Sequence, residues 1–236
     1  MPRRTVILSI VNCLFILALV LSAFAQQPTP GPAGEKGKGG KGKGPATRVG
    51  LFFREEWKSD GQEGGLTQAN VANPNLELKL YGPSGKEMQI AGAPGNETNP
   101  PHPWTGLCTT PCALALRDKN NFVDLSGLSR IHWVTKMSGF HQIRPIVKLA
   151  NGNWLAGDKA DGSVADWLET EISLADVKWL RLDAERAVTT GNYVPTPDLT
   201  KVDEVGFVDL MPSSGHGPGG WADVAKFEVY GKAVAR

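Results

Sequence analysis

The chain has 236 residues, of which 25 are Lys or Arg and 24 are Asp or Glu, so its net charge is close to zero. A nearly neutral chain lacks the basic surface that nucleic-acid binding requires, and we expect no nucleic-acid partner. The length allows one large domain or two small ones.

The first 25 residues have the pattern of a secretory signal peptide. Arg3 and Arg4 supply positive charge, residues 6–24 are almost wholly apolar, and Ala23-Phe24-Ala25 matches a small-residue cleavage site. An uncleaved membrane anchor is the alternative, because the apolar run approaches the length that spans a bilayer. The sequence favours cleavage, which predicts a secreted or periplasmic protein with no membrane span and a net charge of −1.

Residues 26–48 form a low-complexity segment of Pro, Gly and Lys with no aliphatic side chain larger than Ala. Such a segment buries too little apolar surface to offset the entropy lost on ordering, so we expect a disordered linker. Its lysines would make a small basic tether, and contact with an anionic envelope polymer is the sharper alternative to a plain spacer.

From residue 49 the chain is a series of short runs in which apolar and polar residues alternate. The alternation is clearest at 76–81, where Leu76, Leu78 and Leu80 share one face. The predicted strands are 50–54, 76–81, 113–117, 131–137, 143–149, 154–156, 167–173, 178–183 and two within 202–231. No long helical period interrupts them. The sequence therefore predicts an all-β fold, a single jelly-roll β-sandwich over residues 49–236.

The chain ends on two predicted strands joined by a glycine-rich loop, 213–220. Pro212, Pro218 and the glycines exclude a helix there. In the last strand Phe227 and Val229 should face inward, and Glu228 outward. The loop is expected at one end of the sandwich, and its tip is a candidate ligand contact.

Cys108 and Cys112 are the two cysteines left after signal cleavage. In an exported protein, two such close cysteines predict a disulfide that pins a local turn. A redox pair or half of a metal site are the alternatives, but no second Cys/His pair has ligand spacing.

Several stretches together resemble the galactose-binding-domain-like jelly rolls, which include many bacterial carbohydrate-binding modules. These stretches are DLSGLSRIHWVTKMSG at 124–139, IRPIVKLANGNWLAGD at 143–158, VKWLRLD around Trp179, DLTKVDEVGF at 198–207 and VAKFEVYG at 224–231. The chain is also similar to exported bacterial proteins with the same glycine-rich loop. The resemblance covers roughly residues 120–232 and implies a β-sandwich that binds sugars on a concave face or on its end loops.

Some members of that family hold a structural calcium with carboxylates and backbone carbonyls. Glu55, Asp60 and Glu228 lie in the corresponding regions of this chain, so a structural calcium is possible. No other cofactor is expected.

Aromatic side chains are candidate sugar contacts, because the apolar faces of sugars stack on rings while polar groups fix the hydroxyls. Trp104 and Trp221 lie beside predicted loops. If Leu180 and Leu182 face the core, Trp179 faces a groove or solvent. Core packing is the alternative for each of them, and Trp133 is expected in the core.

The polar candidates for holding sugar hydroxyls are Arg144, Asp158, Arg181, Asp209 and His216. Arg144 and Arg181 project from predicted strands, where a solvated face is the plainer interpretation. Asp158 stands in the GDKADG segment, where an ordinary polar turn is the alternative. Asp209 and His216 are the only Asp/His pairing in the glycine-rich segment.

The sequence predicts an exported, non-catalytic binding module, with carbohydrate or a cell-envelope polymer as its partner. One alternative is a structural or protein-docking domain of the cell envelope. Another is a sugar-directed hydrolase that uses Asp209, His216 or the aspartates at 158 and 161. There is no P-loop and no nucleophile-elbow motif. The ligand and the oligomeric state stay open.

Overall fold

The computed structural model describes residues 48–210 and 220–236. All of these residues belong to one unit of the chain, Lys43–Arg236. The predicted signal peptide, all but the last residue of the predicted linker, and His216 lie outside the described residues. In the described part, no helix is long and apolar enough to cross a membrane.

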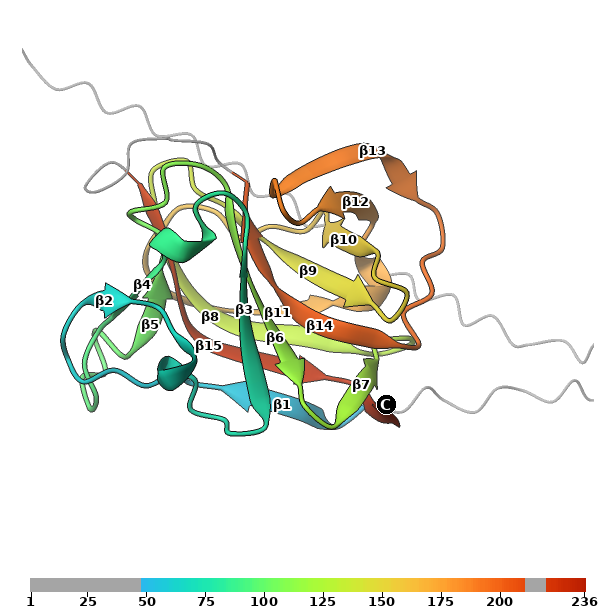
Figure 1. Ribbon diagram of the computed structural model, residues 1–236, viewed down its shortest axis with the longest axis horizontal. Helices are drawn as coiled ribbons and strands as arrows, with labels where there is room; N and C mark the ends of the chain where they lie inside the picture. The colour runs from blue at the N-terminus through green and yellow to red at the C-terminus, as the bar shows by residue number, and fades with distance from the viewer. Residues whose placement is uncertain (1–47, 211–219) are drawn as a thin grey trace, which may run out of the picture. The chain divides into compact units, whose positions relative to one another are not determined.

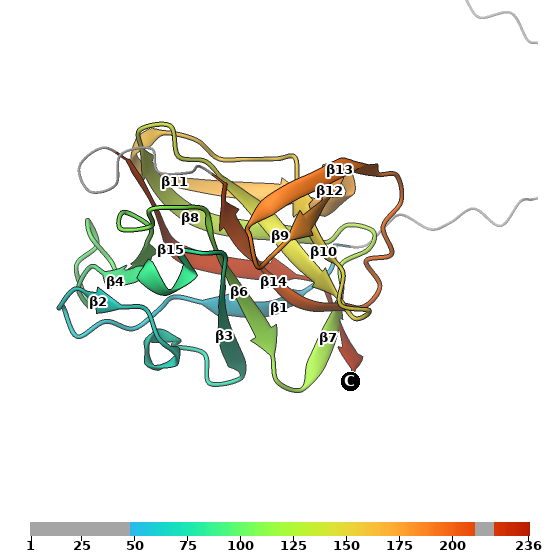
Figure 2. The same cartoon turned by 45° about the horizontal axis from the view of Figure 1, so that its top comes forward.

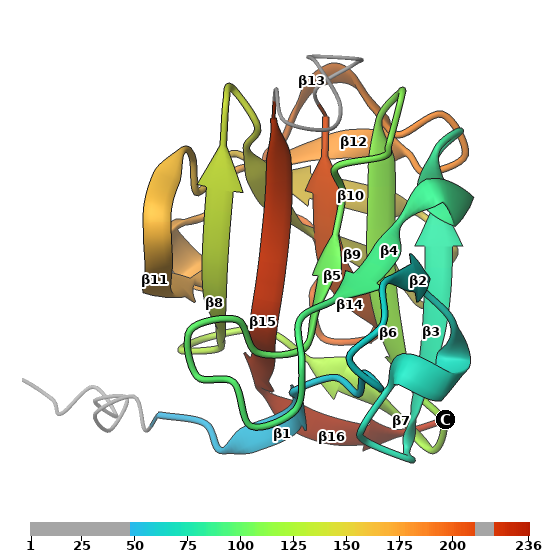
Figure 3. The ribbon, with the colours of Figure 1, turned by 90° about the vertical axis from the view of Figure 1, so that its left-hand side faces the viewer.

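Two antiparallel sheets make up the fold, which confirms the all-β sandwich (Figures 1 and 2). The first sheet has the order β11-β8-β15-β5-β4-β2, and β1 pairs with the far end of β15. Figure 3 shows β11, β8 and β15 side by side, with β5 and β4 beyond them. The strands of this sheet are β11 (Val164–Ser173), β8 (Arg130–Ser138), β15 (Trp221–Tyr230), β5 (His102–Trp104), β4 (Gln89–Ala91), β2 (Gly64–Gly65) and β1 (Leu51–Glu55).

The second sheet has the order β13-β12-β10-β9-β14-β6-β3. In addition, β7 pairs with β14, and β16 pairs with β7. Three short 3-10 helices lie in the connections: η1 (Gln68–Asn70), η2 (Gly85–Glu87) and η3 (Leu174–Asp176). The strands of the second sheet are β13 (Val188–Val194), β12 (Trp179–Asp183), β10 (Trp154–Gly157), β9 (Ile143–Leu149), β14 (Val202–Asp209), β6 (Cys112–Asp118), β3 (Leu76–Tyr81), β7 (Asn121–Asp124) and β16 (Lys232–Ala235).

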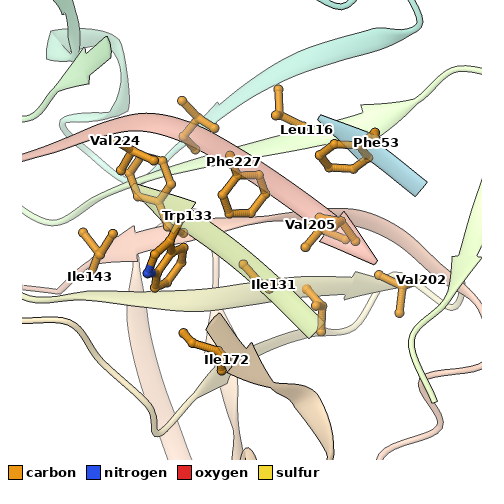
Figure 4. Close-up of a cluster of buried hydrophobic side chains, with 14 of the residues drawn as sticks. Phe53, Leu116, Ile131, Trp133, Ile143, Ile172, Val202, Val205, Val224 and Phe227 are labelled. Atoms are coloured by element: carbon orange, nitrogen blue, oxygen red, sulfur yellow. The ribbon is translucent and has the colours of Figure 1, made fainter. Parts of the chain in front are cut away.

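The main core lies between the inner faces of the two sheets (Figure 4). Trp133 of β8 and Phe227 of β15 are adjacent there, with ring centroids 6.1 Å apart. The ring centroid of Phe53 in β1 also lies 6.1 Å from that of Phe227. Trp133 satisfies its indole N–H by donating to Asp161 Oδ2 at 2.7 Å. A buried indole needs such a partner, so Asp161 serves the core.

The predicted strands are all present. Leu76–Tyr81 and Ile143–Leu149 have the predicted bounds. Ile143, Val147 and Leu149 are buried in the main core, and Leu78 and Leu80 pack against it partly buried. Six strands were not predicted: β2, β4, β5, β7, β13 and β16. Two of these, β7 and β16, pair with each other, and β13 pairs with β12 at the sheet edge, so strand pairing rather than alternation defines them.

The prediction for β12 was wrong in its orientation. Trp179 is only 2% exposed and belongs to the main core, while Leu182 packs in a separate apolar cluster on the outer face of the second sheet. The turn after β12 explains this, because it folds back until Ala184 accepts a hydrogen bond from the Gly82 N–H at 2.9 Å. Leu182 is thereby buried on the outer face of the second sheet instead of in the main core.

The two cysteines are not joined in the structure, which describes both as free and buried. The predicted disulfide is therefore absent. The Cys108 thiol lies 3.5 Å from the Ser84 carbonyl, to which it donates. Burial raises the pKa of Cys112, and the neighbouring Cys108 thiol raises it further. The Cys112 thiol therefore remains protonated, and both cysteines act as small core side chains.

Candidate functional site

Three neighbouring strands of the first sheet bring separate parts of the chain into one row on its outer face. Asp223 of β15 lies directly opposite Trp104 of β5 on one side and Lys136 of β8 on the other. Residues directly opposite each other in an antiparallel pair project from the same face of the sheet. Trp221 is two residues before Asp223, so it projects from this face as well.

Trp167 of β11 completes the group, and we call Trp104, Trp167, Trp221 and Lys136 the tryptophan platform. Lys136 Nζ lies 5.8 Å from the ring centroid of Trp167 and 5.8 Å from that of Trp221. All four side chains are half-buried. An ammonium beside an indole is favoured by about 0.5–1 kcal/mol at exposed sites, so the two rings hold the lysine between them.

Two of the indoles are fixed by their surroundings. Trp167 donates its indole N–H to the Thr98 carbonyl at 3.1 Å, which ties β11 to the loop before β5. Trp104 folds against Gly106, where an added Cβ would fall 2.1 Å from the indole ring. Only glycine leaves room for the ring in that position, so the sequence Trp104-Thr105-Gly106 sets the orientation of this indole.

A buried His–Asp pair supports the platform from below. The His102 ring meets Trp167 edge-on at 5.2 Å, and its Nδ1–H donates to the Pro100 carbonyl at 2.6 Å. Its Nε2 lies 3.4 Å from Asp223 Oδ1. Because Nδ1 carries the proton, a neutral His102 turns the lone pair of Nε2 toward the carboxyl group.

The charges of this pair are suppressed by burial. Burial raises the pKa of Asp223 to about 8, against an opposing effect of Lys136. Burial also lowers the pKa of His102, while the hydrogen bond to Pro100 opposes that change. Both groups are therefore mainly uncharged at neutral pH, and the positive charge of the platform is that of Lys136.

Asp209, a predicted sugar contact, is the last residue of β14 and is buried. Its carboxylate accepts a short hydrogen bond from His141 Nδ1 and a longer one, 3.3 Å, from Thr105 Oγ1. The Thr105 hydroxyl in turn accepts the Ala222 N–H at 2.9 Å. Asp209 therefore connects the residues next to Trp104 and Trp221 and holds the strands of the platform together. The predicted partner, His216, lies outside the described residues.

The other predicted contacts lie elsewhere. Asp158 accepts the Lys178 N–H at 2.8 Å in a turn, which is the plainer of the two interpretations given for it. Arg144 is paired in register with Val208 on the second sheet, and Arg181 is exposed on β12. Trp179 is in the core. Of the predicted ligand residues, the structure brings together Trp104 and Trp221.

Lys136, Trp167 and His102 were missed as site residues. Lys136 stands in a predicted strand, and its position between Ile131-Trp133 and Met137 assigns it to the outer face. The sequence holds no signal that places this lysine beside indoles 31 and 85 residues away, because that depends on which strands are neighbours.

A second aromatic group lies on the outer face of the second sheet, and we call Tyr81, Trp154, Lys148 and Glu204 the second-sheet cluster. Tyr81 and Trp154 meet edge to face at 4.8 Å. Glu204 accepts the Tyr81 hydroxyl at 2.8 Å and the Lys148 ammonium at 2.8 Å. Burial and the hydrogen bond to Glu204 raise the pKa of Tyr81. The Tyr81 hydroxyl, the Lys148 ammonium and the Glu204 carboxylate thus have partners within the cluster.

The carboxylates considered for calcium have protein partners. Glu55 accepts three backbone N–H groups, from Trp57, Ala72 and Asn73. Glu228 binds Arg54, His132 and Tyr230, and Asp60 accepts the N–H of Gln62. In residues 48–210 and 220–236 no group of three or more His, Cys, Asp and Glu side chains could hold a metal ion.

A cavity of about 710 Å³ borders β11 but lies apart from the platform residues; it is lined by Lys159, Ala160, Asp161, Glu171 and Asp176, with Thr170, Ile172 and Ser173. Asp161 is already bonded there to the buried Trp133. The aromatic side chains of the chain are not among the lining residues, so this cavity lacks the stacking surface that a sugar site needs.

No protein-family model matches the chain, and no curated protein matches its sequence. Among solved structures, a family 11 carbohydrate-binding module of a cellulosomal cellulase from Clostridium thermocellum is similar, with 16% identity, a TM-score of 0.42 and coverage of 79% of this chain and 97% of that one. A family 61 module in complex with β-1,4-galactotriose has 12% identity, a TM-score of 0.37 and coverage of 66% and 88%.

A putative sugar-binding protein from Bacteroides thetaiotaomicron is also similar, with 12% identity, a TM-score of 0.39 and coverage of 66% of this chain and 88% of that one. Carbohydrate-binding modules are thus among the similar structures, as the resemblance in the sequence implied. Because these TM-scores are below 0.5, we argue the function from the side chains of this chain.

Proposed function

We propose that the protein is an exported, non-catalytic carbohydrate-binding module that stacks sugar rings on the tryptophan platform. The observation that carries the proposal is that three indoles share one face of one sheet: Trp167 and Trp221 lie beside Lys136, and Trp104 lies opposite Asp223 in the same row. Indole rings offer the flat apolar surface that the C–H faces of a sugar cover, and the ammonium adds a polar contact for ring substituents.

The side chains of the platform are held in place by the surrounding structure before any ligand binds. Its side chains come from regular strands or from positions next to them, and His102, Gly106 and the Thr98 carbonyl fix two of its rings. Side chains held in place before binding lose less conformational entropy when a ligand arrives. Export of the protein follows from the signal peptide predicted at residues 1–25, and it forms part of the same proposal.

Protein docking on the cell envelope is the second candidate, and one feature favours it. Phe140, in the turn that follows β8, is 81% exposed, and Leu107 near the end of β5 is 46% exposed. Large apolar side chains exposed in this way are available for contact with a protein partner. A hydrolase is less supported, because Asp209 is buried and bonded to His141 and Thr105, which assigns it a positioning role.

The test is a binding assay on insoluble polysaccharides, followed by affinity electrophoresis in gels that contain soluble ones. The wild-type chain should bind at least one glycan, and Trp221→Ala should weaken that binding. Trp154→Ala, in the second-sheet cluster, is the matched control and should leave it unchanged. Retention of a protein partner with no binding to any glycan would support docking and overturn the proposal.

A further inference from the structure

We propose that the tryptophan platform selects glycans that carry anionic groups, and that Lys136 is the cation that anchors them. The shared chemistry is a negatively charged substituent on a sugar ring, either a uronate carboxylate or a sulfate ester. This inference rests on the proposed function, since it names the class of ligand that the same platform takes.

Within residues 48–210 and 220–236, Lys136 forms no ion pair with a carboxylate. Its ammonium lies near the two indoles and acts on Asp223 and His102 only through its electrostatic field. Other lysines on the strands of the sandwich differ in this respect: Lys79 lies 2.6 Å from Glu77, Lys148 lies 2.8 Å from Glu204 and Lys226 lies 3.5 Å from Glu169. The charge of Lys136 is therefore available to a ligand.

The nearest carboxyl group on the platform does not neutralise Lys136. Asp223 lies opposite Lys136 in register, but it is 6% exposed and forms no ion pair with the lysine. It faces His102 instead. Because burial favours the protonated carboxyl at neutral pH, the end of the sheet that carries the platform keeps one positive charge there.

A sugar that covers the platform also changes the hydration of Lys136. A ring stacked on Trp167 or Trp221 displaces water from the ammonium that lies 5.8 Å from both ring centroids. Removing water from a charge that stays unpaired is costly. A neutral sugar offers only hydroxyl groups in exchange, whereas an anionic one supplies a charge-assisted hydrogen bond, which is roughly twice as strong as a neutral one.

Three carboxylates farther along the strands of this sheet face have cationic partners: Glu228 with Arg54 and His132, Glu171 with Arg130, and Glu169 with His132 and Lys226. Asp166, beside Trp167 on β11, is exposed and accepts the Trp167 backbone N–H at 2.9 Å. The cation that lacks a carboxylate stands at the end where the indoles gather. Charge and stacking surface thus coincide, which is the combination that an acidic polysaccharide fits.

Two pairs of polysaccharides with matched backbones test the inference by isothermal titration calorimetry on the full chain. Polygalacturonate is compared with its methyl-esterified form, and dextran sulfate with dextran. We expect tighter binding to at least one anionic member, weakened by roughly tenfold or more in Lys136→Gln and largely kept in Lys136→Arg. Lys226→Gln removes a paired lysine from the same face and should change the affinity by less than about twofold.

The outcomes separate this inference from the proposed function. Preference for polygalacturonate names the carboxylate as the source of the anion, and preference for dextran sulfate names the sulfate; either supports the inference if Lys136→Gln abolishes it. Equal binding to charged and neutral members, lost in Trp221→Ala but not in Lys136→Gln, would overturn the inference and keep the proposed function. No binding to any charged or neutral glycan would overturn both.

Discussion

The two outer faces of the sandwich carry the same three kinds of side chain in opposite states. The first sheet has Trp221, Lys136 and Asp223, and the second has Trp154, Lys148 and Glu204. On the second sheet Lys148 Nζ binds Glu204 at 2.8 Å and lies 5.7 Å from the Trp154 ring. On the first sheet Lys136 lies near its indoles, and it forms no ion pair with any carboxylate in the part of the chain that the structure describes.

The two faces show that the charge state of a buried carboxyl group determines whether the lysine beside it is already paired. Glu204 pairs with the charge of Lys148 and accepts a hydrogen bond from Tyr81, so the second-sheet cluster stabilises the fold. Asp223 is neutralised by a proton, as its raised pKa indicates, so the lysine beside it keeps its charge for an incoming group. The first arrangement stabilises the fold, and the second makes a binding surface.

The largest expected change in stability comes from the close packing of β14 against β6 in the second sheet. Gly206→Ala would place a Cβ 1.9 Å from the Leu114 carbonyl oxygen of the neighbouring strand, where backbone must shift. We expect a loss of about 4 kcal/mol or more in the free energy of unfolding, measured by urea denaturation. Gly64→Ala is the control, because nothing lies within 4 Å of the added Cβ. Near-wild-type stability in Gly206→Ala would show that the strands are not so tightly apposed.

The next effect concerns Asp223 and pH. The pKa of this carboxyl group rises from an ordinary 3.8 to about 8 on folding, so the folded state binds more protons between those pH values. Stability should therefore fall as the pH rises from about 4 to 8 and change little beyond. Asp223→Asn should remove this dependence and stabilise the fold at pH 9 by something on the order of 3 kcal/mol.

Thermal unfolding of both proteins from pH 4 to 9 provides the measurement. Among the groups that face Asp223, His102 on β5 has a pKa that burial lowers, away from pH 8, and Lys136 on β8 opposes the rise in the pKa of Asp223. An identical pH profile in the two proteins would mean that Asp223 ionises normally.

A smaller change in stability should separate the two lysines. Lys148→Met leaves the buried Glu204 with only the Tyr81 hydroxyl, and we expect a loss of about 2 kcal/mol in the free energy of unfolding. Lys136→Met removes no ion pair and should cost less than about 0.5 kcal/mol. Chemical denaturation of both variants gives the comparison, and equal losses would contradict the difference between the faces.

The smallest expected effect is on binding. Trp221→Ala should weaken glycan binding by about 1–2 kcal/mol, which is roughly 5- to 30-fold, through loss of one stacking ring. Trp154→Ala should leave the affinity unchanged and lower stability instead, since its ring packs against Tyr81. Affinity electrophoresis with circular dichroism as a folding control measures both. The reverse pattern would place the site on the second sheet.

Much of the fold could be predicted from the sequence. Strands such as Leu76–Tyr81 bury one face against the core, and alternation records that burial directly. The prediction fails at Trp179, because both faces of β12 are covered, one by the core and one by the turn that reaches Gly82. Alternation cannot distinguish which of two covered faces is the core.

The site could be predicted only in part. Trp104 and Trp221 were expected as ligand contacts because they stand beside loops, and the structure places them on one face. Lys136 and Trp167 join them through the pairing of β8 with β15 and β11, which no local pattern records. Asp209 was expected to touch a ligand, yet its partner is His141, 68 residues away in the chain.

The most direct test of the account uses the indole N–H signals of the seven tryptophans in a two-dimensional NMR spectrum. Titration with a glycan that the chain binds, beginning with oligogalacturonate, should shift the signals of Trp104, Trp167 and Trp221. The signals of Trp154 in the second-sheet cluster and of the buried Trp133 and Trp179 should stay in place. A shift of Trp154 with none on the platform would contradict the account.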